Sequence, residues 1–318
     1  MGIAFTFPGQ GSQFVGMGKD LADAFREARA VFDEVDDALG EKLSQIMWDG
    51  SAEALTLTQN TQPALMAVSC AAMRVLEHDF AIGVRAARFV AGHSLGEYSA
   101  LAAAGAISVA DAACLLRIRG KAMQEAVPVG EGAMAALLGV DVEAAAKIAA
   151  EAHGATGLVC DVANDNAPGQ VVISGAKAAV ERAMALGKDY GVRRAIPLPV
   201  SAPFHCTLMR PAADRMAAAL AEVEIQAPAV PLVANVLAQA ISEPDAIRRC
   251  LVEQVTGAVR WRESVAFMAD QDVRTLYEVG AGRVLTGLVR RIDERLEGRA
   301  LGTPAEIESA CRQLAAAV

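Results

Sequence analysis

RFVAGHSLGEYSALAAAGA, residues 88–106, holds a short apolar strand, a glycine-bounded turn and an alanine-rich helix. The turn, Gly92 to Gly96, matches the pattern GxSxG, in which a central serine stands between a strand and a helix. The flanking glycines leave room for neighbouring elements to pack closely, and the sharp turn projects the Ser94 hydroxyl beyond the sheet. A strand that leads directly into a helix predicts an α/β fold.

Ser94 has two possible roles in this turn: it is a nucleophile, or it only caps the helix that follows. A nucleophile on such a turn lies beside helix N-terminal amides, which stabilise an oxygen that develops negative charge by about 3 to 4 kcal/mol per donor. GxSxG also arises by chance, but here a strand precedes it and a helix follows it. We therefore predict that Ser94 is a nucleophile.

Three further apolar segments predict strands, namely residues 3–7, 231–236 and 275–280. Helices are expected over residues 21–39 and 61–80. Strands that alternate with helices require crossover connections, which favour parallel pairing. The sequence therefore predicts a large, α/β-hydrolase-like domain built on a parallel sheet.

Residues 128–201 follow a different order, which is strand, helix, strand, strand, helix, strand. This βαββαβ order predicts a small ferredoxin-like domain inserted into the large one. The large domain is then discontinuous, with residues 1–127 and 202–318. The polar run at residues 164–170 is expected as the hairpin turn between two strands of the insert. We expect the functional site in a cleft between the two domains.

The overall composition excludes several classes of function. The 318-residue chain carries a formal net charge of −9, whereas sequence-independent nucleic-acid binding needs a basic surface. No apolar run is long enough to span a bilayer, and the start of the chain lacks the features of a signal peptide. The six cysteines form no CxxC pair, so we expect no metal site, and reduced thiols in the cytoplasm.

A serine nucleophile requires a general base, and the chain has four histidines. His78 and His153 end predicted helices, and His93 adjoins the serine with its side chain expected to point away. His205 lies in a proline-rich loop that runs into a helix. A helix N-terminus favours the neutral imidazole that a base requires, so His205 is the candidate base. The alternative is a loop histidine with a purely structural hydrogen bond.

Arg119 lies on the apolar face of a predicted helix, whereas Arg117 lies on another face. A guanidinium on a buried face requires an anionic partner, and a carboxylate fits it bidentately. From the spacing alone, that partner is equally a protein Asp or Glu side chain or the carboxylate of a substrate.

The turn after the first strand, FPGQGSQ at residues 7–13, contains two glycines. It fits no nucleotide-binding pattern, because Phe14 and Gln13 stand where such patterns need glycine. In a parallel sheet this turn lies at the same edge as the Ser94 turn, so we expect it to border the site.

Six motifs occur in order along the chain: FPGQGSQ, GHSLGEYSAL, RGKAMQEAVP, NDNAPGQVVISG, SAPFH and YEVGAGRVL. Together they resemble the malonyl-CoA:acyl-carrier-protein transacylase family. The resemblance extends from Phe7 to about Ile292. It implies that Ser94 attacks the thioester of malonyl-CoA, and that the phosphopantetheine thiol of acyl carrier protein then takes the malonyl group from the serine.

The resemblance also implies roles for other residues of the catalytic centre. His205 would take the proton of Ser94, and the backbone carbonyl of Gln254 would orient that histidine. The backbone amides of Gln10 and Leu95 would form the oxyanion hole. The family needs no bound cofactor, so malonyl-CoA enters only as a substrate.

Three residues would determine which acyl group is accepted. The resemblance assigns the malonyl carboxylate to Arg119, and it places Asn164 on the cleft wall from the insert. Phe204 is a departure, because some members of the fatty-acid branch have a smaller residue there, whereas many malonyl-using polyketide acyltransferases have phenylalanine. Its bulk should disfavour branched groups such as methylmalonyl. Fatty-acid synthesis is the pathway we predict, with polyketide synthesis as the alternative.

Carrier proteins of this kind are acidic, so an enzyme with a net charge of −9 would dock them through a local basic patch. We nominate four basic residues for this patch: Lys188, Arg193, Arg290 and Arg291.

Two other classes of function remain. A serine hydrolase or thioesterase would use Ser94 and His205 but admit water, and a noncatalytic subunit would bind an acyl group without forming a serine ester. Arg119 discriminates between transferase and hydrolase, because a general esterase has no need for a carboxylate-binding arginine.

Overall fold

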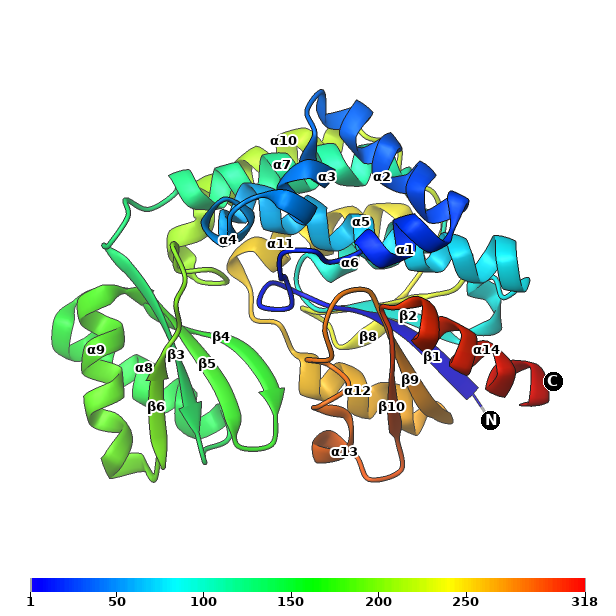
Figure 1. The fold of residues 1–318 in the computed structure, drawn as a ribbon. Helices are drawn as coiled ribbons and strands as arrows, with labels where there is room; N and C mark the ends of the chain where they lie inside the picture. The colour runs from blue at the N-terminus through cyan, green and yellow to red at the C-terminus, as the bar shows by residue number, and fades with distance from the viewer. Residues whose placement is uncertain (1, 318) are drawn as a thin grey trace.

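The computed structural model describes residues 2–317 and contains two sheets (Figure 1). The larger sheet has six strands in the order β10-β9-β1-β2-β7-β8. They are β1 (Gly2–Phe7), β2 (Phe89–Gly92), β7 (Leu232–Ala234), β8 (Gln239–Ile241), β9 (Val273–Val279) and β10 (Glu297–Leu301). All neighbours pair in parallel except β7 and β8. The four predicted strands are confirmed as β1, β2, β7 and β9, and β8 and β10 are additional edge strands.

The smaller sheet has four strands in the order β4-β5-β3-β6, and all of its neighbours are antiparallel. Its elements are β3 (Gly132–Leu138), α8 (Val142–Thr156), β4 (Cys160–Ala167), β5 (Gln170–Ala176), α9 (Lys177–Leu186) and β6 (Arg194–Pro197). This is the predicted βαββαβ order. It has its own apolar core between the sheet and the two helices, which lie together in Figure 1. The domain boundaries at residues 128 and 201 stay a prediction.

The prediction of a hairpin turn over residues 164–170 is wrong in its extent. Strand β4 continues to Ala167, so only Pro168 and Gly169 form the turn. The polar residues stay in the strand because they pair on both sides, with Val171 and Val172 of β5 in their own sheet and with Val259 outside it. The Asp165 amide donates to the Val259 carbonyl at 2.9 Å, and the Asn164–Val259 pair forms an isolated parallel bridge. This pairing joins the small sheet to the rest of the molecule.

Helices cover both faces of the larger sheet (Figure 1). They are α1 (Lys19–Ala24), α2 (Arg26–Leu39), α3 (Leu43–Asp49), α4 (Ala52–Thr56), α5 (Thr58–Phe80), α6 (Gly96–Ala103), α7 (Val109–Glu125), α10 (Arg210–Ala221), α11 (Pro244–Thr256), α12 (Trp261–Asp270), α13 (Val289–Ile292) and α14 (Pro304–Ala317). Three short 3₁₀ helices connect other elements: η1 (Val84–Ala86), η2 (Gly187–Tyr190) and η3 (Thr207–Met209). Within residues 2–317, no helix combines the length and apolarity that crossing a membrane requires.

Alternation along the central strand divides the apolar core in two. Phe5 and Phe7 of β1 belong to the core beneath α5 and α7, whereas Ala4 packs with Trp261 and Met268 of α12 on the opposite face. Successive strand residues point to opposite faces, so one strand supplies both layers.

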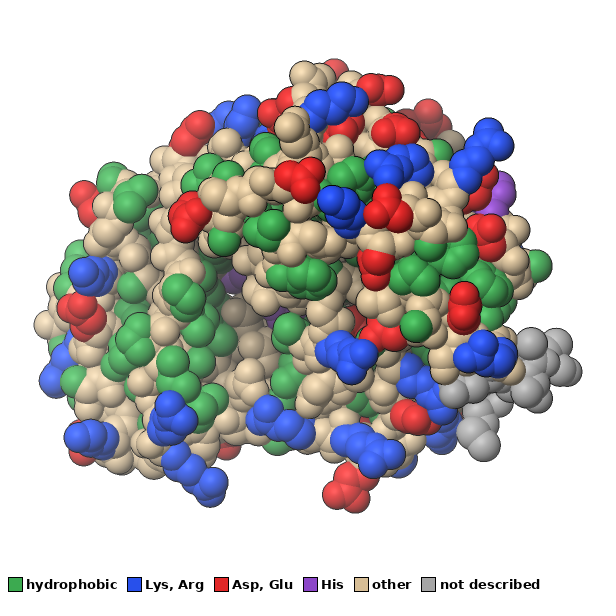
Figure 2. Space-filling view, viewed as in Figure 1, with side chains coloured by type: hydrophobic (Ala, Val, Ile, Leu, Met, Phe, Trp, Pro, Cys, Tyr) green, Lys and Arg blue, Asp and Glu red, His purple; other side chains and the backbone are tan. Residues whose placement is uncertain are grey.

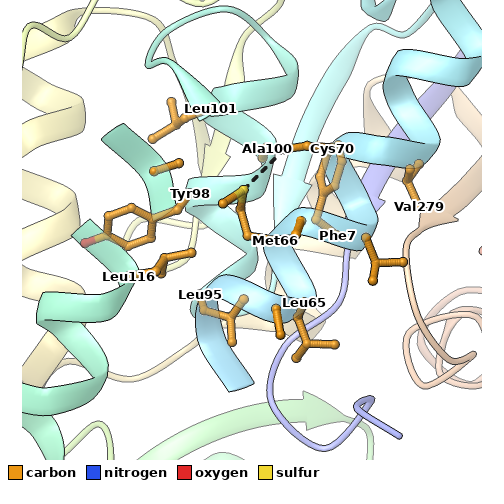
Figure 3. Packing of buried hydrophobic residues seen from close by; sticks show 14 of the residues in the cluster. Phe7, Leu65, Met66, Cys70, Leu95, Tyr98, Ala100, Leu101, Leu116 and Val279 are labelled. Carbon is orange, nitrogen blue, oxygen red and sulfur yellow. Dashed lines mark hydrogen bonds between the residues drawn. The ribbon is translucent and has the colours of Figure 1, made fainter. Parts of the chain in front are cut away.

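The helix that follows the Ser94 turn is fixed by this packing. Leu95 and Tyr98 at the start of α6 lie in one cluster with Phe7 of β1 and with Leu65 and Met66 of α5 (Figure 3). All five side chains are buried. The apolar layer behind the turn therefore holds the candidate nucleophile against the sheet.

The predicted helix over residues 21–39 is interrupted at Phe25. This residue has an extended backbone, with φ −130° and ψ 123°, and it separates α1 from α2. Its ring meets Phe80 edge-on, with 6.3 Å between the ring centroids. Tertiary packing of an aromatic side chain thus overrides the local helical preference.

Candidate active site

Ser94 lies on a strained turn between β2 and α6. Its φ of 54° is in the left-handed region, which non-glycine residues seldom adopt. A Cβ atom at Gly92 would lie 1.9 Å from the Gly96 carbonyl, and one at Gly96 would lie 2.3 Å from the carbonyl oxygen of Phe7. Only glycine fits at both positions. The two glycines therefore permit the turn that presents the Ser94 hydroxyl, as the motif predicted.

His205 is within hydrogen-bonding distance of the serine. Its Nε2 atom lies 2.7 Å from Ser94 Oγ, and its Nδ1 atom lies 2.8 Å from the backbone carbonyl oxygen of Gln254. A carbonyl oxygen only accepts, so Nδ1 carries the proton and Nε2 offers a lone pair to the serine hydroxyl. This tautomer is the one that a general base requires.

The pKa of His205 is lowered to about 3, chiefly by burial and then by the positive charge of Arg119. The hydrogen bond to the Gln254 carbonyl opposes this shift. The predicted helix N-terminus contributes less than expected, because only the short helix η3 follows the histidine, and α10 begins at Arg210. Burial, which the sequence did not indicate, is the main reason that this imidazole is neutral.

We expect acylation of Ser94 to lack an acid limb near pH 6.5, because His205 stays neutral well below that pH. Single-turnover acylation rates between about pH 5 and about pH 7 should be nearly constant. A rate that falls tenfold per pH unit below about pH 6.5 would contradict this.

The low pKa of His205 also affects folding stability. Between the unfolded and folded pKa values only the unfolded chain binds this proton, so the contribution of His205 to stability is lost as the pH falls from about 6.5 toward about 3.

Arg119 is fully buried beside the serine, as its place on the apolar face predicted. Its Nη2 atom donates to Ser94 Oγ at 3.1 Å and to Gln254 Oε1 at 2.7 Å, and its Nη1 atom donates to Gln62 Oε1 at 2.8 Å. Its Nε atom has no partner among the described residues. No acidic side chain of residues 2–317 pairs with it directly, and neutral amide oxygens hold the guanidinium.

A buried polar cluster behind Ser94 was not predicted from the sequence. Asn235, at the end of β7, accepts from the Ser94 amide at 2.8 Å, and its own side chain donates to the Gly92 carbonyl at 2.7 Å. Gln254 Nε2 donates to the Ser94 carbonyl at 2.9 Å and to Glu97. The available signal was a polar residue directly after an apolar strand, at the sheet edge where Ser94 lies.

The candidate residues line a cavity of about 490 Å³. Ser94, His205 and Arg119 form part of its wall, and Met134 of β3 and Asn164 of β4 line it from the smaller sheet. Figure 2 shows the hollow between the part of the molecule built on the smaller sheet and the part built on the larger sheet, with histidine atoms deep inside it. The site therefore lies between the two sheets.

Three other predicted residues, Gln10, Leu95 and Phe204, line the same cavity. The backbone amides of Gln10 and Leu95 donate to no acceptor within residues 2–317, so both are free to bind an oxyanion. Phe204 is buried next to His205 and forms part of the cavity wall.

His93 points away from the serine hydroxyl, as predicted. Its Nε2 atom lies 2.9 Å from Asn166 Oδ1 of β4, and its ring lies 5.7 Å from that of Trp261. Burial lowers its pKa. His93 therefore links the Ser94 turn to the smaller sheet.

The four nominated docking residues lie outside the cavity, and all four are exposed. They belong to two segments: Lys188 and Arg193 precede β6, and Arg290 and Arg291 lie in α13.

Comparison with known proteins identifies the family. The model of a family described as "Acyl transferase domain" matches residues 4–299. The malonyl CoA-acyl carrier protein transacylase of Escherichia coli (strain K12) is 50% identical over 308 residues, which cover 97% of this chain and 98% of that protein. The chain belongs to the malonyl-CoA:acyl-carrier-protein transacylase family.

Solved structures of transacylases share the fold described above. The acyl-carrier-protein-S-malonyltransferase of Bartonella henselae is 55% identical with a TM-score of 0.96, and the match covers 99% of this chain and 100% of that one. A malonyl-transacylase in complex with a type II PKS acyl-carrier protein is 44% identical with a TM-score of 0.94, over 98% of this chain and 100% of that one. The transacylase fold thus extends over nearly the whole chain.

Proposed function

We propose that this transacylase moves a malonyl group from malonyl-CoA to the phosphopantetheine thiol of an acyl carrier protein, through a malonyl ester of Ser94. The observation that carries the proposal is the contact of Ser94 Oγ with both His205 Nε2 and Arg119 Nη2, at 2.7 and 3.1 Å. A base and a carboxylate-binding cation therefore flank one hydroxyl. The E. coli relative is a transacylase of this kind.

In the first half-reaction, Ser94 Oγ attacks the thioester carbon while His205 takes the hydroxyl proton. The oxygen–carbon bond forms, the carbon–sulfur bond breaks, and His205 returns the proton to the departing coenzyme A thiolate. The amides of Gln10 and Leu95 would stabilise the oxyanion of the tetrahedral intermediate. The second half-reaction runs in reverse, with the thiol of the carrier as the attacking group.

Arg119 would bind the malonyl carboxylate, and this pairing also affects the base. The Arg119 charge is the second largest cause of the low pKa of His205. A carboxylate that neutralises this charge removes part of that effect, so His205 becomes a stronger base when malonyl-CoA is bound. An acetyl group brings no charge and gives no such gain.

The experiment that tests the proposal follows the malonyl group after the serine ester has formed. Isolated malonyl-enzyme is mixed with holo acyl carrier protein or with buffer alone, and the carrier and free malonate are quantified by mass spectrometry. Transfer to the carrier, with slow release of malonate in buffer, supports a transacylase. Rapid release of malonate in buffer would identify a hydrolase, and the absence of a serine ester would identify a noncatalytic acyl-binding subunit.

We propose fatty-acid synthesis in the cytoplasm as the setting of this reaction. All six cysteines are free thiols, which suits a reducing compartment. The 44% identical malonyl-transacylase was solved with a type II PKS carrier, so a polyketide carrier is the alternative acceptor for the same chemistry. Malonyl-CoA enters as a substrate, and the proposed steps use no resident cofactor.

We also propose that Arg193, Arg290 and Arg291, with Lys188, form the docking patch for the acidic carrier. Arg291 donates to Gln170 Oε1 at 2.8 Å, at the turn between β4 and β5. The Arg193 side chain packs on Gly139, whose amide donates to the Gly169 carbonyl of the same turn at 2.9 Å. These contacts join the two basic segments at one end of the smaller sheet, and Figure 2 shows basic side chains on both sides of the hollow.

Reversing the charge at this patch should weaken binding of the carrier alone. We expect Arg290→Glu and Arg291→Glu each to raise the KM for acyl carrier protein about three- to tenfold, with the KM for malonyl-CoA unchanged. Arg26→Glu on α2 is the matched control, because Arg26 is exposed and the net charge changes equally. The patch is wrong if both variants give the carrier KM of this control.

A further inference from the structure

Glu97 is a fully buried carboxylate that the steps above do not use. It lies in the first turn of α6, and only 1% of its surface is exposed. Its Oε1 atom accepts from the backbone amide of Asn235 at 2.6 Å, and its Oε2 atom accepts from the side-chain Nε2 atom of Gln254. No cationic side chain of residues 2–317 pairs with it directly. A buried carboxylate between two neutral donors is costly, so its presence calls for a reason.

The surroundings of Glu97 oppose the protonation that burial favours. Burial is the largest influence on the pKa of Glu97, and the pKa is raised to about 8 even though the hydrogen bonds from Asn235 and Gln254 and the charge of Arg119 act to lower it. Both carboxyl oxygens face N–H donors, so a proton on either oxygen would point at another donor. This arrangement fits the charged carboxylate, which accepts on both sides.

The reason for the buried charge lies in the orientation of the Gln254 amide. The two ends of a glutamine amide are similar in shape, but one end donates and the other accepts. A carboxylate without a proton only accepts, so Glu97 holds the Nε2 end of Gln254 toward itself and toward the Ser94 carbonyl. The Oε1 end must then face Arg119, from which it accepts at 2.7 Å.

The opposite orientation would present donors to a cation. If the Gln254 amide were reversed, its NH₂ group would face Arg119 Nη2, and neither would have an acceptor there. The guanidinium would lose one of the two amide oxygens that hold it, the other being Gln62 Oε1. Glu97 therefore affects the position of Arg119 indirectly, by fixing the orientation of the Gln254 amide that Arg119 contacts.

An amide oxygen at this point also leaves the charge of Arg119 available. Gln254 and Gln62 hold the guanidinium with neutral oxygens, whereas a directly bonded carboxylate would compete with the substrate for it. Glu97 supplies a negative charge one side chain away, which stabilises the buried cation in the free enzyme without occupying its binding atoms.

We propose that Glu97 is a positioning residue for acyl-group selection: by fixing the Gln254 amide it aims Arg119 at the carboxylate of the malonyl group. The proposal deepens the assignment of Arg119 and rests on the proposed function. It concerns the preference for a carboxylate-bearing acyl group, and an effect on the reaction of an uncharged acetyl group is not part of it.

The test replaces Glu97 by its amide. In Glu97→Gln, the side-chain oxygen at this position can still accept from the Asn235 amide, but the new NH₂ group meets Gln254 Nε2, donor against donor. We expect the ratio of kcat/KM for malonyl-CoA to that for acetyl-CoA to fall about tenfold or more, with acetyl-CoA changed less than about threefold. The loss should lie mainly in the KM for malonyl-CoA.

Glu278→Gln is the matched control. Glu278 is also fully buried and accepts from two amides, those of Leu285 at 3.0 Å and Thr286 at 2.6 Å, but it does not line the cavity. It should lower stability comparably and leave the malonyl-to-acetyl ratio at the wild-type value. If the wild-type enzyme forms no malonyl-serine, the proposed function itself is refuted. That result differs from a failure of the Glu97 proposal alone, in which malonyl-serine forms but Glu97→Gln keeps the wild-type ratio.

A second variant keeps the test valid if Glu97→Gln does not fold. Gln254→Met removes both ends of the amide, so it should lower the ratio by itself, and adding Glu97→Gln should lower it no further. The proposal is overturned by a Glu97→Gln enzyme with the wild-type ratio, by a Gln254→Met enzyme with the wild-type ratio, or by an additive loss in the double variant.

Discussion

Replacing Ser94 by alanine should abolish malonyl transfer to the carrier, with kcat reduced by at least about 10⁴-fold. Ser94 Oγ is within hydrogen-bonding distance of both His205 Nε2 and Arg119 Nη2, so its removal leaves the base without a nucleophile. The measurement is steady-state transfer of the malonyl group from malonyl-CoA to holo acyl carrier protein. The fold should survive, because the turn depends on Gly92 and Gly96 rather than on the hydroxyl.

His205→Ala provides the check on this first prediction. Base and nucleophile act as one unit, so the double variant Ser94→Ala/His205→Ala should be no slower than Ser94→Ala alone. A Ser94→Ala enzyme that keeps even about one percent of the wild-type kcat would show that another group carries the acyl chain.

Replacing Arg119 by alanine should convert a malonyl-selective enzyme into one that prefers acetyl-CoA. We expect kcat/KM for malonyl-CoA to fall about 10²- to 10³-fold, because removing one partner of a buried, hydrogen-bonded ion pair costs about 2 to 5 kcal/mol. The acetyl group has no carboxylate to leave unpaired, so acetyl-CoA should react at a rate within about tenfold of wild type. Competition between the two thioesters, read as the ratio of serine adducts, measures the change.

Arg117→Ala is the matched control for Arg119. Arg117 lies two residues earlier in α7 and bonds to Asn60 and Glu41, away from the cavity. Its removal should lower stability but leave the malonyl-to-acetyl ratio unchanged. Equal shifts of this ratio in both variants would mean that α7 as a whole, and not the Arg119 guanidinium, determines the choice of acyl group.

Much of the fold could be predicted because it depends on local patterns. The apolar strands with glycine turns identified β1, β2, β7 and β9, and the order of elements between residues 128 and 201 identified the second sheet. The edge strands β8 and β10 are short and half-exposed, so they lack that apolar signal. The break at Phe25 depends on an aromatic partner at Phe80, which no local pattern contains.

The residues of the candidate site also fall into two groups, those with a local sequence signal and those without one. Ser94 follows from a motif, and Arg119 follows from its place on a helical face. Glu97 and the side chain of Gln254 could not be found in this manner, because their contact joins residues 157 positions apart in the sequence. The polar cluster behind the serine exists only once β7 and α11 have packed against α6.

Formation of a malonyl ester on Ser94 can be measured as the intact mass of the enzyme after brief incubation with malonyl-CoA, without the carrier. We expect one added malonyl group on wild type, located on the peptide that contains Ser94, and none on Ser94→Ala. In parallel with acetyl-CoA, wild type should take malonyl in preference, and Arg119→Ala should reverse that preference. A malonyl adduct that persists on Ser94→Ala would show that Ser94 is not the nucleophile, and an Arg119→Ala enzyme that still prefers malonyl would show that Arg119 does not select the acyl group.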